Sequence, residues 1–200
     1  MVNSILIVFI ALSPTLPKLP FQCEPMVANG DCISAVVHLR RSSNRIVAIG
    51  AFSNMKYDEE HAYGYTVELW RERDRIFGFF LSSQGLMGDT PTGLLEDVRF
   101  DFKSGKISFR ARLTTGLFSN RQFHNVPSRD IFRFTGFLRK DRLVGSLEIT
   151  NGLTPEEASR RERIRLKRSK NEAESMIEAE SYDEWKNKAD EILKFRGPKW

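Results

Sequence analysis

The sequence predicts a mostly β protein, an antiparallel up-and-down barrel of about 8–9 strands with a C-terminal amphipathic helix. Three observations support this fold class. Residues 33–150 alternate apolar and polar side chains with a period of two. Polar turn signals separate these runs at regular spacing, as in barrels and sandwiches. Residues 181–195 then change to a helical period.

The chain opens with an apolar run from Ile5 to Leu12. This run is too short to span a bilayer, but its length fits the core of a secretory signal. We therefore assign residues 1–22 to a signal or other targeting segment and expect export to the periplasm or the extracellular space. The alternative is a cytoplasmic protein whose start codon is placed too early. Cys23 and Cys32 follow; they either form a disulfide, as in oxidising compartments, or stay free thiols.

Residues 23–168 are assigned to the barrel, and four hairpins account for most of this domain. Each hairpin joins two alternating runs through a polar turn. The paired runs are "CISAVVHLRR" with "RIVAIGAFSN", "HAYGYTVELWRE" with "RIFGFFLSS", "GLLEDVRFDF" with "KISFRARLTT", and "RDIFRFTGFLR" with "RLVGSLEIT". A last strand is predicted at "ERIRLKR", where Ile164 and Leu166 share one face. Glycines inside the strands indicate sharp curvature or close approach of a neighbour, which favours a closed barrel.

The registers of two hairpins follow from matching the residues that would face each other. For the last hairpin, with its turn at Lys140 and Asp141, the predicted pairs are Leu138–Leu143, Gly136–Gly145, Phe134–Leu147, Phe132–Ile149, Phe137–Val144, Thr135–Ser146 and Arg133–Glu148. For the hairpin that turns at "KSG", they are Phe100–Ile107, Val98–Phe109, Leu94–Leu113, Asp101–Lys106 and Asp97–Arg110. In both hairpins apolar residues meet on one face and opposite charges meet on the other.

Glu96 interrupts the apolar face of its predicted strand. In the register above it lies on the same side as Leu94 and Val98, opposite Ala111. A carboxylate that points into a barrel must find partners or hold a proton. We therefore predict that Glu96 points inward, where it either binds loop amides near the strand end or marks a site.

The stretch "GLMGDTPTG", residues 85–93, does not match a nucleotide-binding loop. Gly88 is followed by Asp89 instead of lysine, and a strand follows instead of a helix. Asp89 alone does not make a calcium loop, because calcium needs several oxygen ligands. A long loop at a barrel mouth can contact a ligand, so Asp89 is a candidate binding residue.

The inner faces of the strands are rich in aromatic side chains, which either fill the core or line a small pocket. The candidate ligand-binding residues are Glu96, Tyr65, Phe79, Phe109, Phe134 and Asp89. The three histidines show no metal-ligand spacing, and no nucleophile–base arrangement is present. We expect no metal, no cofactor and no catalytic residue. If the protein is an enzyme, Glu68 or Glu96 is the candidate acid–base group.

The C-terminal part, residues 169–200, is predicted as a linker followed by the helix. Ser181 is the expected N-cap, and one helix face carries Tyr182, Trp185, Ala189, Ile192 and Leu193. Residues 160–170 carry seven basic side chains and one acid, whereas residues 171–184 carry six acids and no base. Because these blocks can neutralise each other, we expect no nucleic-acid partner.

The segments "YGYTVELW", "GFFLSSQGLMGDTPTGLLEDVRFDFKSGKISFRARL" and "FRFTGFLRKDRLVGSLE" resemble a group of uncharacterised bacterial proteins with a glycine-punctuated barrel pattern. The resemblance covers residues 63–150 and implies an architecture without a chemistry. Lipocalins are similar in overall plan, but their "GxW" signature is absent. Ligand binding is therefore an architectural analogy only.

These observations leave three hypotheses. The first is an exported, non-enzymatic barrel that binds a small apolar or amphipathic ligand in its interior, without a transmembrane span. The second is a structural or interaction protein that uses the charged C-terminal segment. The third is an enzyme that uses Glu96 or Glu68. The sequence gives no indication of the oligomeric state.

Overall fold

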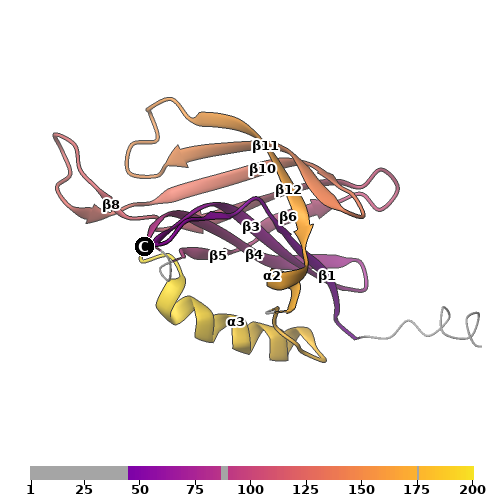
Figure 1. The fold of residues 1–200 in the computed structure, drawn as a ribbon. Helices are drawn as coiled ribbons and strands as arrows, with labels where there is room; N and C mark the ends of the chain where they lie inside the picture. The colour runs from indigo at the N-terminus through magenta and orange to yellow at the C-terminus, as the bar shows by residue number, and fades with distance from the viewer. Residues whose placement is uncertain (1–44, 87–89, 175) are drawn as a thin grey trace, which may run out of the picture. The chain divides into compact units, whose positions relative to one another are not determined.

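The protein folds as a nearly closed antiparallel β-barrel with a C-terminal helix on its outside (Figure 1). A computed structural model describes residues 45–86, 90–174 and 176–200. Their strands are β1 (Val47–Ser53), β2 (Lys56–Tyr57), β3 (His61–Glu72), β4 (Arg75–Leu86), β5 (Thr92–Leu94), β6 (Glu96–Phe100), β7 (Lys106–Leu113), β8 (Leu117–Phe118), β9 (Val126–Pro127), β10 (Asp130–Leu138), β11 (Arg142–Asn151) and β12 (Arg160–Ser169). The helices are α2 (Lys170–Glu174) and α3 (Tyr182–Arg196).

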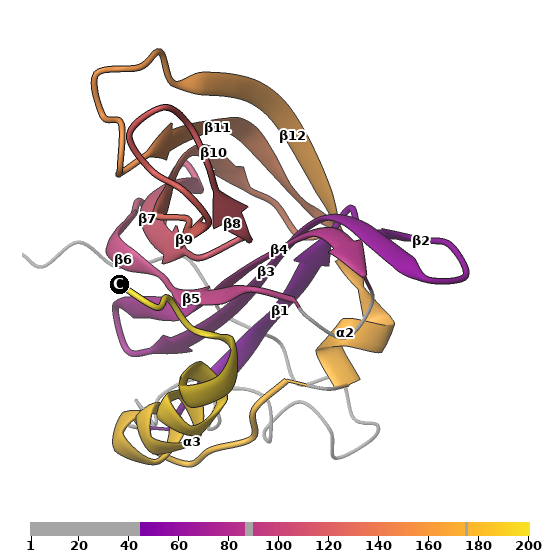
Figure 2. The same cartoon turned by 90° about the vertical axis from the view of Figure 1, so that its left-hand side faces the viewer.

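The strands follow one another around the barrel wall nearly in chain order, which is an up-and-down topology. Their order is β5, β4, β3, β1, β12, β11, β10, β7 and β6. The short β2 pairs with β3, and β8 and β9 form a separate ribbon. Figure 2 shows this ribbon at one end of the barrel. The predicted first strand, "CISAVVHLRR", lies outside the described residues, and β1 pairs with β3 and β12.

The barrel closes at two narrow seams. The first is the β1–β12 seam, where only three residue pairs, from Ala51–Ser169 to Ser53–Lys167, are in register. The second lies between β5 and β6, which are separated in the chain only by Leu95. The N–H of Leu95 donates to the carbonyl of Gly78 on β4 at 2.9 Å, while the following residues of β6 pair with β7. The strand therefore changes partner at Leu95 and bridges the two halves of the wall.

The β10–β11 hairpin has the predicted register at every position. All seven predicted pairs are present, from Phe132–Ile149 at one end to Leu138–Leu143 at the turn. Gly136 and Gly145 face each other, and a Cβ on Gly136 would lie 2.2 Å from the carbonyl oxygen of Val144. Glycine is therefore required here by close approach of the backbone, as the in-strand glycines predicted.

The predicted last strand at "ERIRLKR" is confirmed as part of β12. Its pairing with β11 runs from Arg142–Lys167 to Ile149–Arg160. Ile164 and Leu166 are buried in the barrel core, whereas the intervening Arg163 and Arg165 are exposed. Strand periodicity thus holds, and the basic side chains of this strand project from the outer wall.

Helix α3 covers the outer face of β3 and β4. Ser181 caps its N-terminus by accepting a hydrogen bond from the N–H of Glu184 at 3.3 Å. Trp185 is 1% exposed, and its ring centroid lies 4.7 Å from that of Phe77 and 5.2 Å from that of Trp70. Both faces of the β3–β4 pair are therefore buried, one against the barrel core and the other against α3. No helix among the described residues is long and apolar enough to cross a membrane.

Candidate functional site

The barrel interior is a packed hydrophobic core over the part of the chain that the structure describes. Tyr65, Phe109 and Phe134 were candidates for lining an internal ligand pocket, and each is at most 6% exposed. The rings of Phe109 and Phe134 stack with centroids 5.0 Å apart, and Tyr65 stacks on Phe80 at 5.6 Å. These side chains contact one another, so they fill the space that the expected internal ligand would occupy.

Polar side chains close both ends of this core. At one end the hydroxyl of Tyr65 donates to the carboxylate of Glu162 at 2.5 Å and accepts from Arg160 at 3.3 Å. Burial, followed by the hydrogen bond to Glu162, raises the pKa of Tyr65 to about 12. At the other end the guanidinium of Arg168 lies over the ring of Phe52 and donates to the carbonyl of Ile49 at 2.6 Å.

Phe79 lies on the outside of the barrel wall, where it packs under α3. It is 2% exposed, and its ring centroid is 5.3 Å from that of Trp185. The expectation that Phe79 faces the interior is therefore wrong. The run "RIFGFF" is buried on both faces, so it lacks the alternation that would have shown which residues point inward.

Glu96 also differs from the prediction. A β-bulge between Glu96 and Arg99 shifts the register, so Glu96 faces Arg110 instead of Ala111. Asp97 adopts φ 53° within this bulge. The slip moves the carboxylate to the outer face, where it accepts hydrogen bonds from Arg110 at 3.0 Å and Arg112 at 2.8 Å. Glu96 thus belongs to a surface ion pair and does not point into the barrel.

The remaining candidates contribute no site within the described residues. Asp89, Cys23 and Cys32 lie outside those residues. His61 contacts Asp58 at 3.2 Å on the surface, and His124 is exposed in a loop. Across the described ranges, no group of three or more His, Cys, Asp or Glu side chains could hold a metal ion.

A pocket with two carboxylates lies outside the barrel wall, between β3, β4, β5 and the C-terminal helices. Its volume is about 320 Å³. Its floor follows two cross-strand rows on the outer face of the sheet, Glu68–Phe79 and Thr66–Leu81–Thr92. Glu172 of α2, and Ile177, Ile192 and Arg196, complete the lining together with Met55, Tyr57 and Thr90. We call this space the carboxylate pocket.

The carboxylate of Glu68 is poorly solvated in this pocket. Its cross-strand neighbours on the outer face are Ala51, which is fully buried, and Phe79. No hydrogen bond or ion pair to this carboxylate is found among the described residues. Burial, and next the negative charge of Glu172, raise the pKa of Glu68 to about 7. Near neutral pH this group is therefore close to half protonated.

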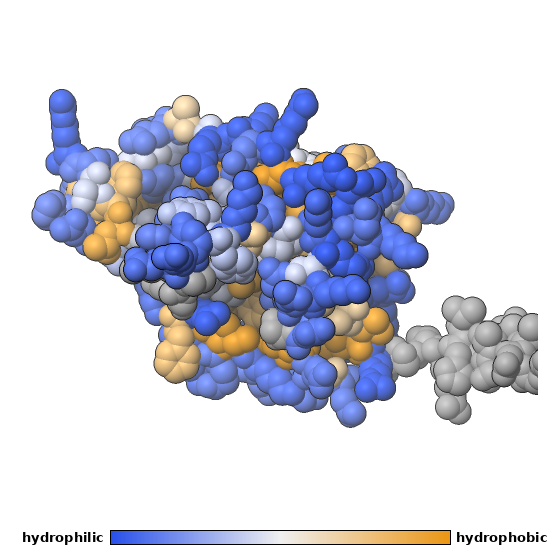
Figure 3. All heavy atoms as spheres, in the orientation of Figure 1, coloured by the Kyte–Doolittle hydropathy of each residue, from blue (hydrophilic) through white to orange (hydrophobic). Residues whose placement is uncertain are grey.

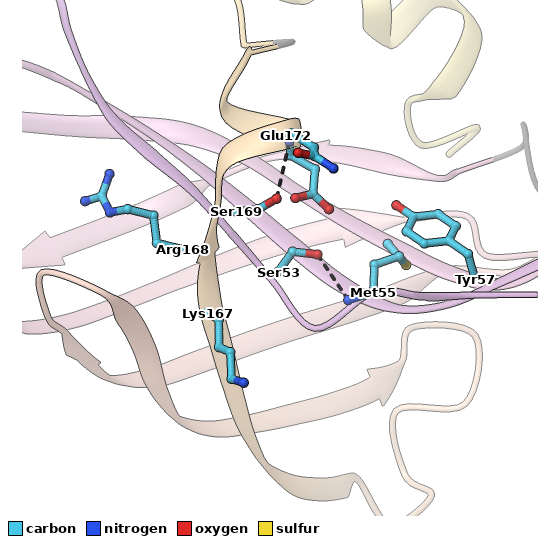
Figure 4. A pocket seen from close by; sticks show the side chains of 8 residues that line it. Ser53, Met55, Tyr57, Lys167, Arg168, Ser169 and Glu172 are labelled. Atoms are coloured by element: carbon cyan, nitrogen blue, oxygen red, sulfur yellow. Dashed lines mark hydrogen bonds between the residues drawn. The ribbon is translucent and has the colours of Figure 1, made fainter.

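Glu172 forms the wall between the carboxylate pocket and a second, larger cavity of about 570 Å³. Both cavities share Met55, Tyr57 and Glu172. In Figure 4 the Tyr57 hydroxyl points toward the Glu172 carboxylate, whereas the Lys167 and Arg168 side chains point away from it. Burial, and next the charge of Glu172, raise the pKa of Tyr57. Burial first, and the negative charge of Glu172 second, thus raise the pKa values of both Glu68 and Tyr57.

This arrangement suits a ligand that carries a positive charge. Two carboxylates and one guanidinium, that of Arg196, line a partly enclosed space, so acids outnumber bases there. The other lining residues are three threonines, Tyr57 and five apolar residues, Met55, Phe79, Leu81, Ile177 and Ile192. Burial removes water from the charged Glu68 carboxylate. A cation bound beside Glu68 would compensate for this lost solvation. The same pKa of about 7 also suits a group that gives and takes protons.

Sequence reasoning identified Glu68 only as an alternative to Glu96 for an acid–base group. The second carboxylate of the pocket, Glu172, is more than one hundred positions away, in the segment assigned to a linker. One signal was available in the sequence. Glu68 lies between Thr66 and Trp70 on one face of its strand, and the alternation of side chains along this strand does not explain an acid at that position. The approach of Glu172 depends on how α2 returns to the barrel, which no local pattern encodes.

Comparisons with known proteins add no family. No family model, no curated protein and no solved structure matches the chain. The structure shows the barrel architecture that this resemblance implied. Membership of the group of uncharacterised bacterial barrel proteins stays a prediction.

Proposed function

We propose that the protein is a non-enzymatic binding protein for a small amphipathic amine, held in the carboxylate pocket outside the barrel wall. One observation carries the proposal. The Glu68 carboxylate is largely buried, has no hydrogen-bond or ion-pair partner among the described residues, and faces a second carboxylate across a cavity. An isolated buried charge is unfavourable, and a bound ammonium group would neutralise it.

The size and lining of the pocket indicate the kind of amine. A volume of about 320 Å³ is at the lower end for small-molecule sites. Phe79, Leu81 and Ile192 offer an apolar surface beside the two acids. The pocket thus has an acidic part and an apolar part. A ligand would match both if its ammonium group lay near Glu68 and its short alkyl or aryl body packed against these side chains.

Calorimetric titration with n-hexylamine at pH 8 tests the proposal, and n-hexanol serves as the uncharged ligand of the same length. Wild-type protein should bind hexylamine at least about tenfold more tightly than hexanol, which corresponds to about 1.4 kcal/mol. Glu68→Gln should remove this preference. Glu157→Gln is the matched control, because Glu157 is exposed and does not line the pocket.

Binding should also depend on pH in a defined direction. Hexylamine stays protonated in this range, whereas Glu68 gains a proton as pH falls through about 7. Affinity should therefore weaken by up to about tenfold for each pH unit below 7 in the wild type and should stay flat in Glu68→Gln. Equal binding of hexylamine and hexanol, or unchanged binding by Glu68→Gln, would exclude the amine site.

A second candidate function is acid–base catalysis at Glu68. Its pKa of about 7 lies where a general acid or base is most effective. The two functions differ in outcome: a binding protein returns the amine unchanged, whereas an enzyme converts it. Mass analysis of the ligand recovered after long incubation, with Glu68→Gln as the inactive control, separates them.

Export and the pairing of Cys23 with Cys32 are part of the same proposal. The apolar run at Ile5–Leu12 supports a removable signal. Native mass spectrometry of the mature protein would give its N-terminus, the cysteine redox state and any co-purified amine. A mature chain that still begins at Met1 would contradict removal of a signal.

A further inference from the structure

The outer face of β7, β10, β11 and β12 presents its side chains in regular cross-strand rows. The strands pair in continuous register, so residues from all four lie side by side. One row is Lys106–Phe137–Val144–Arg165, and the next is Ser108–Thr135–Ser146–Arg163. We call this surface the basic face; it lies on the opposite side of the barrel from α3 (Figure 1).

Cations outnumber anions on the basic face. Its acids are already paired, because Glu96 binds Arg110 and Arg112, and Glu148 binds Arg161 at 2.5 Å. Five further cations on these strands are exposed and have no carboxylate within ion-pair distance among the described residues, and Arg99 on the neighbouring β6 is a sixth. The five are Lys106, Arg133, Arg163, Arg165 and Lys167. Of these cations, Lys167 lines the same cavity as the acidic Glu172 of α2, but its side chain points away from that carboxylate (Figure 4).

The centre of the basic face is apolar. Phe137 and Val144 are paired across β10 and β11, and they are 43% and 37% exposed. Together with Gly136, Gly145 and Ile164 they line a shallow depression of about 460 Å³. Figure 3 shows small hydrophobic areas within a mostly hydrophilic surface over this side of the barrel. An exposed ring beside an exposed aliphatic group, rimmed by unpaired cations, is thus the main feature of this surface.

We propose that the basic face docks the protein on an anionic phospholipid surface. The unpaired cations match the negative headgroups, and Phe137 and Val144 can enter the boundary between headgroups and acyl chains. This inference does not depend on the carboxylate pocket, which lies outside a different part of the barrel wall, over β3, β4 and β5.

The composition of the face favours lipid over nucleic acid. Proteins that hold single strands combine a positive groove with several aromatic side chains on which successive bases stack. Phe137 is the only aromatic side chain in the two rows described above, and Val144 beside it offers no stacking surface. The outer wall of a barrel is also convex, which suits a broad surface better than an extended strand.

Sedimentation of the full chain with vesicles tests the proposal. The vesicles consist of phosphatidylcholine alone or of phosphatidylcholine mixed with phosphatidylglycerol. The protein should bind only the anionic vesicles and should be released by high salt. Each phospholipid-facing cation contributes about fivefold, so Arg163→Ala/Arg165→Ala should weaken partitioning by about 25-fold. Phe137→Ser should weaken it further without changing the salt dependence.

The control is Lys56→Ala/Arg121→Ala, which removes two exposed cations outside the basic face. Circular dichroism shows whether each variant keeps the barrel. Normal binding by the control and weak binding by the folded Arg163/Arg165 variant would support the proposal. No binding to anionic vesicles, or equal losses in both double variants, would overturn it. Binding to a single-stranded polynucleotide that competes fully with vesicles and is unaffected by Phe137→Ser would also overturn it, in favour of a polyanion site.

Discussion

Replacing Glu68 with glutamine should stabilise the protein above pH 7 and leave its stability unchanged below pH 4.5. The pKa of Glu68 rises from 4.5 to about 7 on folding, first through burial and then through Glu172. Below 4.5 the carboxyl is protonated in both the native and the unfolded state, so it contributes no difference. As pH rises to about 7 the unfolded state loses its proton first, and the free energy of unfolding falls.

The magnitude follows from the size of the shift. Raising a pKa from 4.5 to about 7 corresponds to roughly 3 kcal/mol of native-state destabilisation at high pH. Glu68 is only partly enclosed, so solvent screening reduces the expected effect to about 2 kcal/mol. Glutamine resembles the protonated carboxyl in shape and polarity, and it removes the charge that is unfavourable next to Glu172.

Urea unfolding of Glu68→Gln and wild type over a series of pH values measures this effect. The difference in unfolding free energy should be near zero below pH 4.5 and should grow to about 2 kcal/mol in favour of the variant above pH 7. Glu157→Gln should show no such trend. A difference that stays constant with pH, or a variant less stable than wild type at high pH, would refute the assignment of Glu68 as a buried, uncompensated acid.

Three further changes test the packing. Trp185→Ala should lower the free energy of unfolding by about 4 kcal/mol and expose α3 to hydrogen exchange, because Trp185 fills the space over Trp70 and Phe77. Trp185→Phe should change the free energy of unfolding by less than about 1.5 kcal/mol, since the buried indole N–H has no partner among the described residues. Gly136→Ala should destabilise the barrel by at least about 2 kcal/mol in urea unfolding, because its Cβ would meet the Val144 carbonyl. Gly85→Ala, which has open space around its Cβ position, should be nearly neutral. Tyr65→Phe should lower the free energy of unfolding at pH 7 by about 1.5 kcal/mol through loss of the hydrogen bond to Glu162; no change would mean that Arg160 alone satisfies that carboxylate.

The parts of the fold that sequence reasoning predicted well are those with one buried and one exposed face. From Phe132 to Leu138 in β10 and from Leu143 to Ile149 in β11, every inward residue is apolar or glycine and most outward residues are polar. One register therefore satisfies all of these positions, and the structure has it. In β12 the alternation of Ile164 and Leu166 with Arg163 and Arg165 was sufficient to predict a strand and its inward face, for the same reason.

The prediction was wrong where local geometry or tertiary cover changes the pattern. The bulge at Asp97 moved Glu96 from the expected inner face to the outer face, and left Leu95 in the core in place of Leu94. Phe79 was misplaced because α3 buries the second face of β4. The carboxylate pocket could not be predicted, because it joins Glu68 to Glu172 through the path of the chain after β12.

The narrow β1–β12 seam has a consequence for how the protein avoids self-association. Only the last three residues of β12 pair with β1, so among the described residues the backbone of Arg160–Leu166 has β11 as its only strand partner and its other edge is unpaired. An open strand edge is a template for pairing with another chain, and charged side chains discourage such pairing. The arginines at 160, 161, 163 and 165 repel an identical edge on a second molecule. Replacing them with threonine would remove a barrier to edge-to-edge aggregation, as well as charge from the outer wall.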